Sequence, residues 1–188
     1  AGNGSPADTA NDGPASNASV GGPIPITVDS QGNVYFISQN VLARKIGTDG
    51  IIAAVAGFGT GGDGSPAASA SLKPSSGLCT DAAGNIYIAE TGGHRIRKVR
   101  NGVITTVAGT GASGFSGDSG QATSAQLSSP FSVVADSAGN IYVADYAGFQ
   151  EVCQSYKRPD NPLLIPETGG TTASARYMFY ALADFDAM

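Results

Sequence analysis

The sequence alternates between short apolar runs and polar, glycine-rich turns. The pattern is clearest over residues 81–109, where an apolar strand, a basic strand and a Thr/Val strand are separated by polar turns. β-Branched and aromatic residues fill the apolar runs, as is typical of strands. Asp, Asn and Gly fill the turns, where they bond the neighbouring backbone or accept a positive φ. The segment therefore predicts a series of antiparallel hairpins.

This hairpin pattern occurs three times. An Asp-x-x-Gly-Asn turn followed by an apolar run begins at Asp29, Asp81 and Asp136, so the copies are 52 residues (29 to 81) and 55 residues (81 to 136) apart. The linkers between copies repeat as well, each with a small alanine and an apolar residue that we expect to anchor the linker in the core. These anchors are Ala18, Ala70 and Ala125, with Val20, Leu72 and Leu127.

One repeat contains four predicted strands, which in the second copy are a strand before Asp81 and strands at 86–90, 95–99 and 103–107. Four antiparallel strands in a repeat of this length predict a β-propeller blade. The predicted fold class is therefore all-β, with three propeller blades per chain. We place the repeats at residues 1–54, 55–106 and 107–152, followed by a divergent C-terminal segment at 153–188.

The run GNIYIAETGGHRIRKV, preceded by the loop GDGSPAASASL, resembles the NHL-repeat family of β-propellers. The likeness covers residues 1 to about 149. The triplet that names the family corresponds here to residues 93–96, with Gly in place of Asn, and the first and third repeats depart further from it. The resemblance implies a propeller, an architecture that hosts binding modules, scaffolds and several unrelated enzymes.

Three blades do not close a propeller ring, because closed rings have roughly 4–8 blades. The apolar outer faces of the first and third blades therefore require a partner. A composite ring of two chains, a larger propeller of which this chain is a piece, and an extended assembly would each supply one. We predict self-association.

The aromatic C-terminal stretch has no place in the repeat. It suits an edge strand of the third blade, an amphipathic helix, or a segment inserted into a neighbouring chain. We expect its apolar residues to contribute to self-association: Tyr177, Met178, Phe179, Tyr180, Leu182 and Phe185.

The order of strands in a blade predicts where a ligand binds. The loop between the second and third strands and the linker between blades lie on one face of the propeller, and long loops on a rigid scaffold commonly carry function. The candidate binding residues on this face are Glu90, Thr91, His94, Phe115, Asp118, Asp145, Tyr146 and Phe149.

Catalytic and metal chemistry has little support in the residues. His94 is the only histidine, and we predict that it hydrogen-bonds within its own blade. The repeated Asp turns lack the succession of oxygen ligands that a calcium loop needs, so we interpret them as hairpin turns. We predict no metal site and no cofactor.

Charge and hydropathy exclude several partner classes. The net charge of −5 disfavours nucleic acid, and we interpret the basic run at 94–100 as a solvated strand edge. No apolar run approaches the roughly 20 residues of a membrane helix, so we predict no membrane insertion.

Two glycosylation acceptor triplets begin at Asn3 and Asn17, and the chain begins with Ala, which is consistent with removal of a leader. We therefore expect an extracellular or cell-surface location, with the periplasm as an alternative. Cys79 and Cys153 are compatible either with a disulfide between them or with two free thiols.

The function that these observations favour is a non-enzymatic extracellular propeller module that acts in self-assembly or in binding a protein or glycan. The alternative is a propeller enzyme of the lactonase, lyase or hydrolase type, with a metal-assisted site formed on a composite ring.

Overall fold

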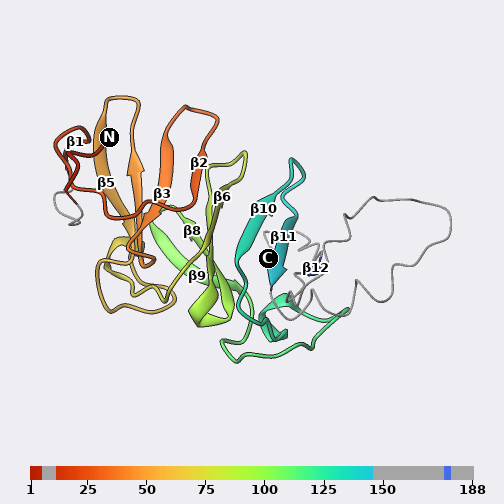
Figure 1. Cartoon of the computed structure of the whole chain (residues 1–188). Coiled ribbons are helices and arrows are strands. Elements are labelled where there is room, and N and C mark those ends of the chain that lie inside the picture. The colour runs from red at the N-terminus through yellow and green to blue at the C-terminus, as the bar shows by residue number, and fades with distance from the viewer. Residues whose placement is uncertain (6–11, 146–175, 179–188) are drawn as a thin grey trace, which may run out of the picture.

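The computed structural model describes residues 1–5, 12–145 and 176–178, which form three antiparallel sheets in succession along the chain (Figure 1). The first contains β1 (Gly13–Pro14), β2 (Ile26–Val28), β3 (Val34–Ser38), β4 (Leu42–Ile46) and β5 (Ile51–Ala56). The second contains β6 (Gly77–Thr80), β7 (Ile86–Glu90), β8 (Arg95–Arg100) and β9 (Val103–Ala108). The third contains β10 (Ser132–Ala135), β11 (Ile141–Asp145) and β12 (Arg176–Met178).

The sheets are propeller blades, which confirms the predicted fold class. In the second blade the strands lie in the order β6-β7-β8-β9, and the first blade has the same order from β2 to β5, with β1 added beyond β5. Short 3-10 helices complete the connections: η1 (Ala67–Ser69), η2 (Thr91–Gly93) and η3 (Ala122–Ser124). No helix in the described part of the chain is long and apolar enough to cross a membrane.

The short strand β12 completes the described part of the third blade. It pairs with β11 so that Arg176 lies opposite Asp145, just as Arg95 lies opposite Glu90 in the second blade. Of the three alternatives for the aromatic stretch, the structure thus shows an edge strand of its own blade at these residues. Tyr177 and Met178 lie in β12, and the remaining candidates for self-association are outside the described residues: Phe179, Tyr180, Leu182 and Phe185.

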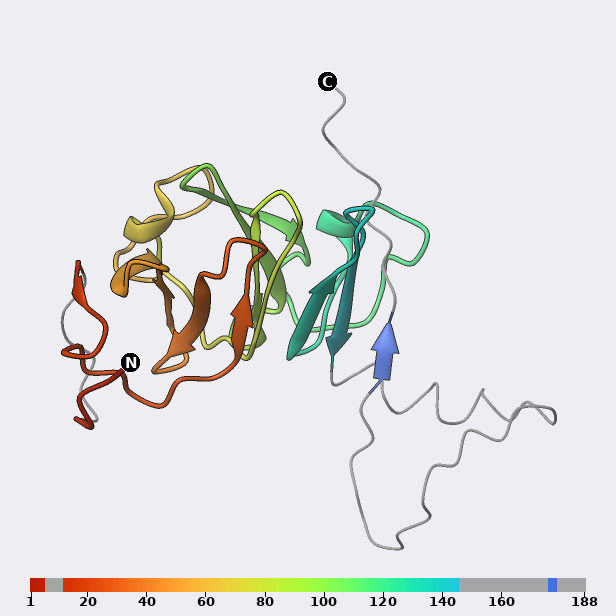
Figure 2. The ribbon, with the colours of Figure 1, turned by 90° about the horizontal axis from the view of Figure 1, so that it is seen from above.

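The blades stand side by side, with the first strands β2, β6 and β10 in contact (Figure 2). Successive residues of a strand point to opposite faces. Each blade therefore has a leading face toward the preceding blade and a trailing face toward the following one. In the second blade Ile86 and Ile88 belong to the leading face and pack with Ile37 of the first blade. Tyr87 belongs to the trailing face and packs with Val133 of the third.

The linkers fill the spaces between blades, as the repeated Ala and apolar positions predicted. Ala70 and Leu72 are buried in the core between the first and second blades, and Leu127 is buried in the core between the second and third. Ala18 covers the leading face of the first blade, with Val20 packed against it. The predicted anchors are confirmed.

Candidate functional site

The loops and turns divide between two faces of the molecule, as the strand order predicted. The turns between first and second strands, such as β2–β3 and β10–β11, lie at the top of Figure 1, and the linkers leading to the next blade descend below the sheets. The candidate binding residues that the structure describes belong to the lower face, here called the linker face.

Glu90 ends β7 on the linker face, and its side chain is fully buried. Its Oε1 accepts a hydrogen bond from the backbone N–H of Lys73 at 2.8 Å, and its Oε2 pairs with Arg95. Asp145 holds the equivalent position at the end of β11, where its Oδ2 accepts from the backbone N–H of Ser128 at 2.8 Å. Each carboxylate thus fixes the linker that enters its own blade.

Arg97 extends the Glu90 interaction into a buried ion-pair network. Its Nη2 lies 2.7 Å from Asp63 Oδ1 and its Nη1 lies 3.6 Å from Glu90 Oε1. The side chain is buried because Arg97 pairs with Ile88 across the sheet and shares the leading face, which the linker covers. The interpretation of residues 94–100 as a solvated strand edge is therefore wrong at Arg97.

Arg44 repeats this burial in the first blade. Only 1% of the residue is exposed, and its Nη1 donates to the backbone oxygen of Ser19 in the N-terminal linker at 3.0 Å. A buried arginine beneath a linker is thus a shared feature of the first two blades.

His94 follows η2 with a left-handed backbone (φ 51°). Its Nδ1 accepts a hydrogen bond from the backbone N–H of Ser129 at 3.0 Å, so that nitrogen is unprotonated in this contact. Ser129 belongs to the linker that enters the third blade. The prediction that His94 bonds within its own blade is therefore wrong: the imidazole joins two blades. The Thr91 hydroxyl also joins the second blade to this linker, because its Oγ1–H donates a hydrogen bond to the Pro130 carbonyl at 2.7 Å.

Phe115 and Asp118 lie exposed on the linker between the second and third blades. Phe115 is 39% exposed, as is Phe58 on the preceding linker. The other two candidates, Tyr146 and Phe149, are outside the described residues.

The glycosylation candidates lie at the surface of the N-terminal linker. Asn3 and Asn17 are both exposed, and Asn3 Nδ2 donates to the Asn17 carbonyl at 3.1 Å. Asn3 Oδ1 accepts from the hydroxyl of Ser19 at 3.2 Å.

Cys79 is buried between the second and third blades. Burial, together with the negative charge of Asp81, raises the pKa of its thiol to about 12.

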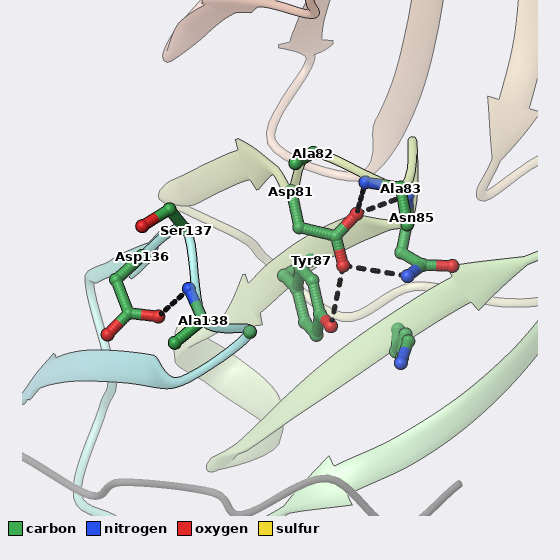
Figure 3. A pocket seen from close by; sticks show the side chains of 10 residues that line it. Asp81, Ala82, Ala83, Asn85, Tyr87, Asp136, Ser137 and Ala138 are labelled. Atoms are coloured by element: carbon green, nitrogen blue, oxygen red, sulfur yellow. Dashed lines mark hydrogen bonds between the residues drawn. The ribbon is translucent and has the colours of Figure 1, made fainter.

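The opposite face carries the repeated Asp turns (Figure 3). Asp81 Oδ1 accepts from the backbone N–H groups of Ala83 (3.0 Å) and Asn85 (2.8 Å), while Oδ2 accepts from the Asn85 side chain (2.7 Å) and the Tyr87 hydroxyl (3.1 Å). Asp29 and Asp136 make the same four bonds with their own turns. The glycine of each turn has a positive φ, 79° at Gly84. The hairpin-turn interpretation is confirmed.

A pocket of about 220 Å³ lies between the Asp turns of the second and third blades. Its walls include Tyr87, Lys98 and Ser137, and Lys98 Nζ stands 5.4 Å from the centre of the Tyr87 ring. The residues near Asp81 and Asp136 that enclose it are visible in Figure 3. Because a carboxylate has about four acceptor sites, four internal hydrogen bonds leave Asp81 little capacity to bind a cation. Among the described residues, no three His, Cys, Asp or Glu side chains are grouped to hold a metal ion.

Several solved structures resemble this chain. A protein of unknown function from Bacteroides thetaiotaomicron is 25% identical with a TM-score of 0.55, over 68% of this chain and 34% of that one. An auxiliary nutrient binding protein from the same organism is 20% identical with a TM-score of 0.50, over 64% of this chain and 34% of that one. Virginiamycin B lyase from Staphylococcus aureus is 17% identical with a TM-score of 0.45, over 68% of this chain and 36% of that one.

These structures are propeller-type proteins, and the chain spans about a third of their length. No family model and no curated protein matches the chain. The comparisons therefore show a β-propeller fold.

The Asp turns predict an acid dependence of stability. Partial burial alone would raise the pKa of Asp29, but the hydrogen bonds from Asn33, Gln31 and Tyr35 outweigh it and lower the pKa. The hydrogen bond from the Asn140 side chain is the largest influence on Asp136, and its pKa is also lowered. A pKa that is lower in the folded state stabilises the fold above the unfolded value near 3.9. This contribution is lost as the pH falls through the folded value.

We expect the free energy of unfolding to fall on acidification below about pH 4, and to depend less on pH in Asp29→Asn and Asp136→Asn. Urea denaturation at a series of pH values measures this. Asp49→Asn is the control, because Asp49 lies outside the three Asp turns and accepts a hydrogen bond from the backbone N–H of Ile51 at 3.0 Å in place of their four bonds. An unchanged acid dependence in both test variants would contradict this role for the Asp turns.

The Glu90 network predicts a large effect of one buried side chain. Glu90→Ala removes the acceptor for Lys73 and leaves the buried Arg97 with only Asp63, so we expect a loss of about 3–5 kcal/mol in the free energy of unfolding. Asp63→Ala is the control and should cost less, because the Asp63 side chain is 49% exposed and its removal leaves Arg97 paired with the buried Glu90. Urea denaturation measures the free energy of unfolding of both variants. Equal losses would contradict the prediction that the buried carboxylate of Glu90 stabilises the fold more than the exposed carboxylate of Asp63.

Proposed function

We propose that this chain is an NHL-type propeller module that binds a protein or glycan outside the cell, without catalysis, through its linker face. The observation that carries the proposal is that the side chains on that face which could act as acids or bases are engaged in hydrogen bonds with the linkers. Glu90, Asp145 and His94 all accept hydrogen bonds from linker backbone, so their chemistry serves to position loops.

The linker that carries Phe115 is held by backbone hydrogen bonds at several points. Thr110 N–H donates to the Ala125 carbonyl at 2.9 Å, and Gln126 N–H donates to the Ser116 carbonyl at 2.9 Å. A loop that is already ordered loses little conformational entropy when a ligand binds. Phe115 is therefore a pre-positioned aromatic contact.

An exposed aromatic ring suits both proposed ligand classes. It stacks on the C–H groups of a sugar ring, or it packs against an apolar side chain of a protein, and aromatic residues are enriched among binding hot spots. Asp118, three residues further along the same linker, is exposed and acidic, and a carboxylate has several acceptor sites for hydroxyl or amide groups. The acceptor triplets that begin at the exposed residues Asn3 and Asn17 support an extracellular or cell-surface location.

We expect the purified chain to bind at least one member of an array of polysaccharides and extracellular-matrix proteins. Phe115→Ala should weaken that binding about tenfold or more, equivalent to about 1.4 kcal/mol. Isothermal titration calorimetry with the captured ligand provides the measurement. The control is Phe58→Ala, which removes an equally exposed ring from a different linker.

Turnover of a lactone or ester substrate would support the enzyme alternative instead. If such activity is present and His94→Ala abolishes it while the circular dichroism spectrum is preserved, the proposal of a non-catalytic module is wrong.

A further inference from the structure

One position of the first strand is buried in the second and third blades and exposed in the first. Counting back from the Asp turns, Ile26 corresponds to Leu78 and Val133. Leu78 is 7% exposed in the core shared with the first blade, and Val133 is 2% exposed in the core shared with the second. Ile26 is 64% exposed. These residues are similar in chemistry, so the difference reflects whether a preceding blade covers the leading face.

The trailing faces show the same difference at the other end of the chain. Cys79 is 8% exposed and packs in the core with the third blade, whereas its counterpart Val134 on β10 is 53% exposed. Tyr87 is 4% exposed, and its counterpart Tyr142 is half-buried. The described residues therefore leave an apolar trailing face on the third blade uncovered.

The exposed surface of the leading face extends along β2 and the residues just before it. Ile24, before β2, is 55% exposed and Val28, at its end, is 56% exposed. Residues two apart in a strand share a face, so Val28 adds to the surface of Ile26. Exposed clusters of large apolar side chains mark interaction surfaces.

We propose that the leading face of the first blade docks on the trailing face of the third blade in a second copy of this chain. The second copy is the partner that the observations favour, because this contact repeats an interface that each chain already forms twice. In both internal interfaces a leading-face residue, Leu78 or Val133, packs on the trailing face of the blade before it.

The contact is heterologous, because the two faces that meet are different surfaces of the chain. Two copies form a closed ring when the leading face of each copy meets the trailing face of the other. Two copies then contribute six described blades, within the roughly 4–8 blades of closed propellers. The arrangement is independent of the ligand proposed above, since it involves sheet faces and not Phe115 or the linker around it.

Light scattering coupled to size-exclusion chromatography tests the proposal on the full chain. The molar mass measured for the wild-type protein should be twice the chain mass of 18.7 kDa. Ile26→Asp and Val134→Asp should each elute at the mass of one chain, because each places a charge in one of the two faces. Val103→Asp is the control, since Val103 is also exposed (41%) but lies on β9.

Mixing the two variants distinguishes head-to-tail contact from other arrangements. The Ile26→Asp chain retains its trailing face and the Val134→Asp chain retains its leading face, so a mixture should form dimers that neither variant forms alone. A symmetric contact of Ile26 with Ile26 predicts no such rescue.

Ile26→Thr provides a milder change if the charged variants do not fold, and it should raise the dimer dissociation constant at least tenfold. A wild-type chain that is monomeric at its highest soluble concentration would overturn the proposal. A dimer that persists in both charged variants, or a mixture without rescue, would overturn it as well.

Discussion

Each blade of this chain is a sheet with apolar side chains on both faces, and the fold depends on packing the face of one blade against the face of the next. Leu78 and Val133 show how this requirement is met, since each is buried against the blade before it. Full burial of a side chain of this size contributes roughly 1.5–3 kcal/mol. The linkers fill what the blades leave open, with Ala70 and Leu72 inserted between the first two sheets. The same requirement explains why the outermost faces, marked by Ile26 and Val134, are suited to contact another copy.

The titratable side chains Glu90, Asp145 and His94 on the linker face accept hydrogen bonds from the backbone of the linkers and hold them in place. Glu90 is fully buried, and its carboxylate binds both a linker N–H and the buried network of Arg97. His94 is engaged by Ser129. The linkers held in this way carry exposed aromatic side chains such as Phe115, and the proposed binding role rests on that arrangement.

Local features were predictable from the sequence and distant contacts were not. The Asp turns and the alanine anchors depend on neighbouring residues and on a repeated spacing, so the strand order followed from them. The burial of Arg97 and the partner of His94 depend on linkers about 35 residues away, which no local pattern reveals. The pocket between Asp turns was also missed. The tyrosine six residues after each Asp, such as Tyr87 after Asp81, was the available signal, because its ring lines that pocket.

The most direct test of blade-to-blade packing compares one position in three blades. The free energy of unfolding should be measured by urea denaturation for Leu78→Ala, Val133→Ala and Ile26→Ala, at concentrations where the chain is monomeric. We predict a loss of about 2–5 kcal/mol at Leu78, a smaller but clear loss at Val133, and a change within about 0.5 kcal/mol at Ile26. A loss at Ile26 as large as that at Leu78 would contradict this prediction, because the exposed residue would then contribute as much without a neighbouring blade.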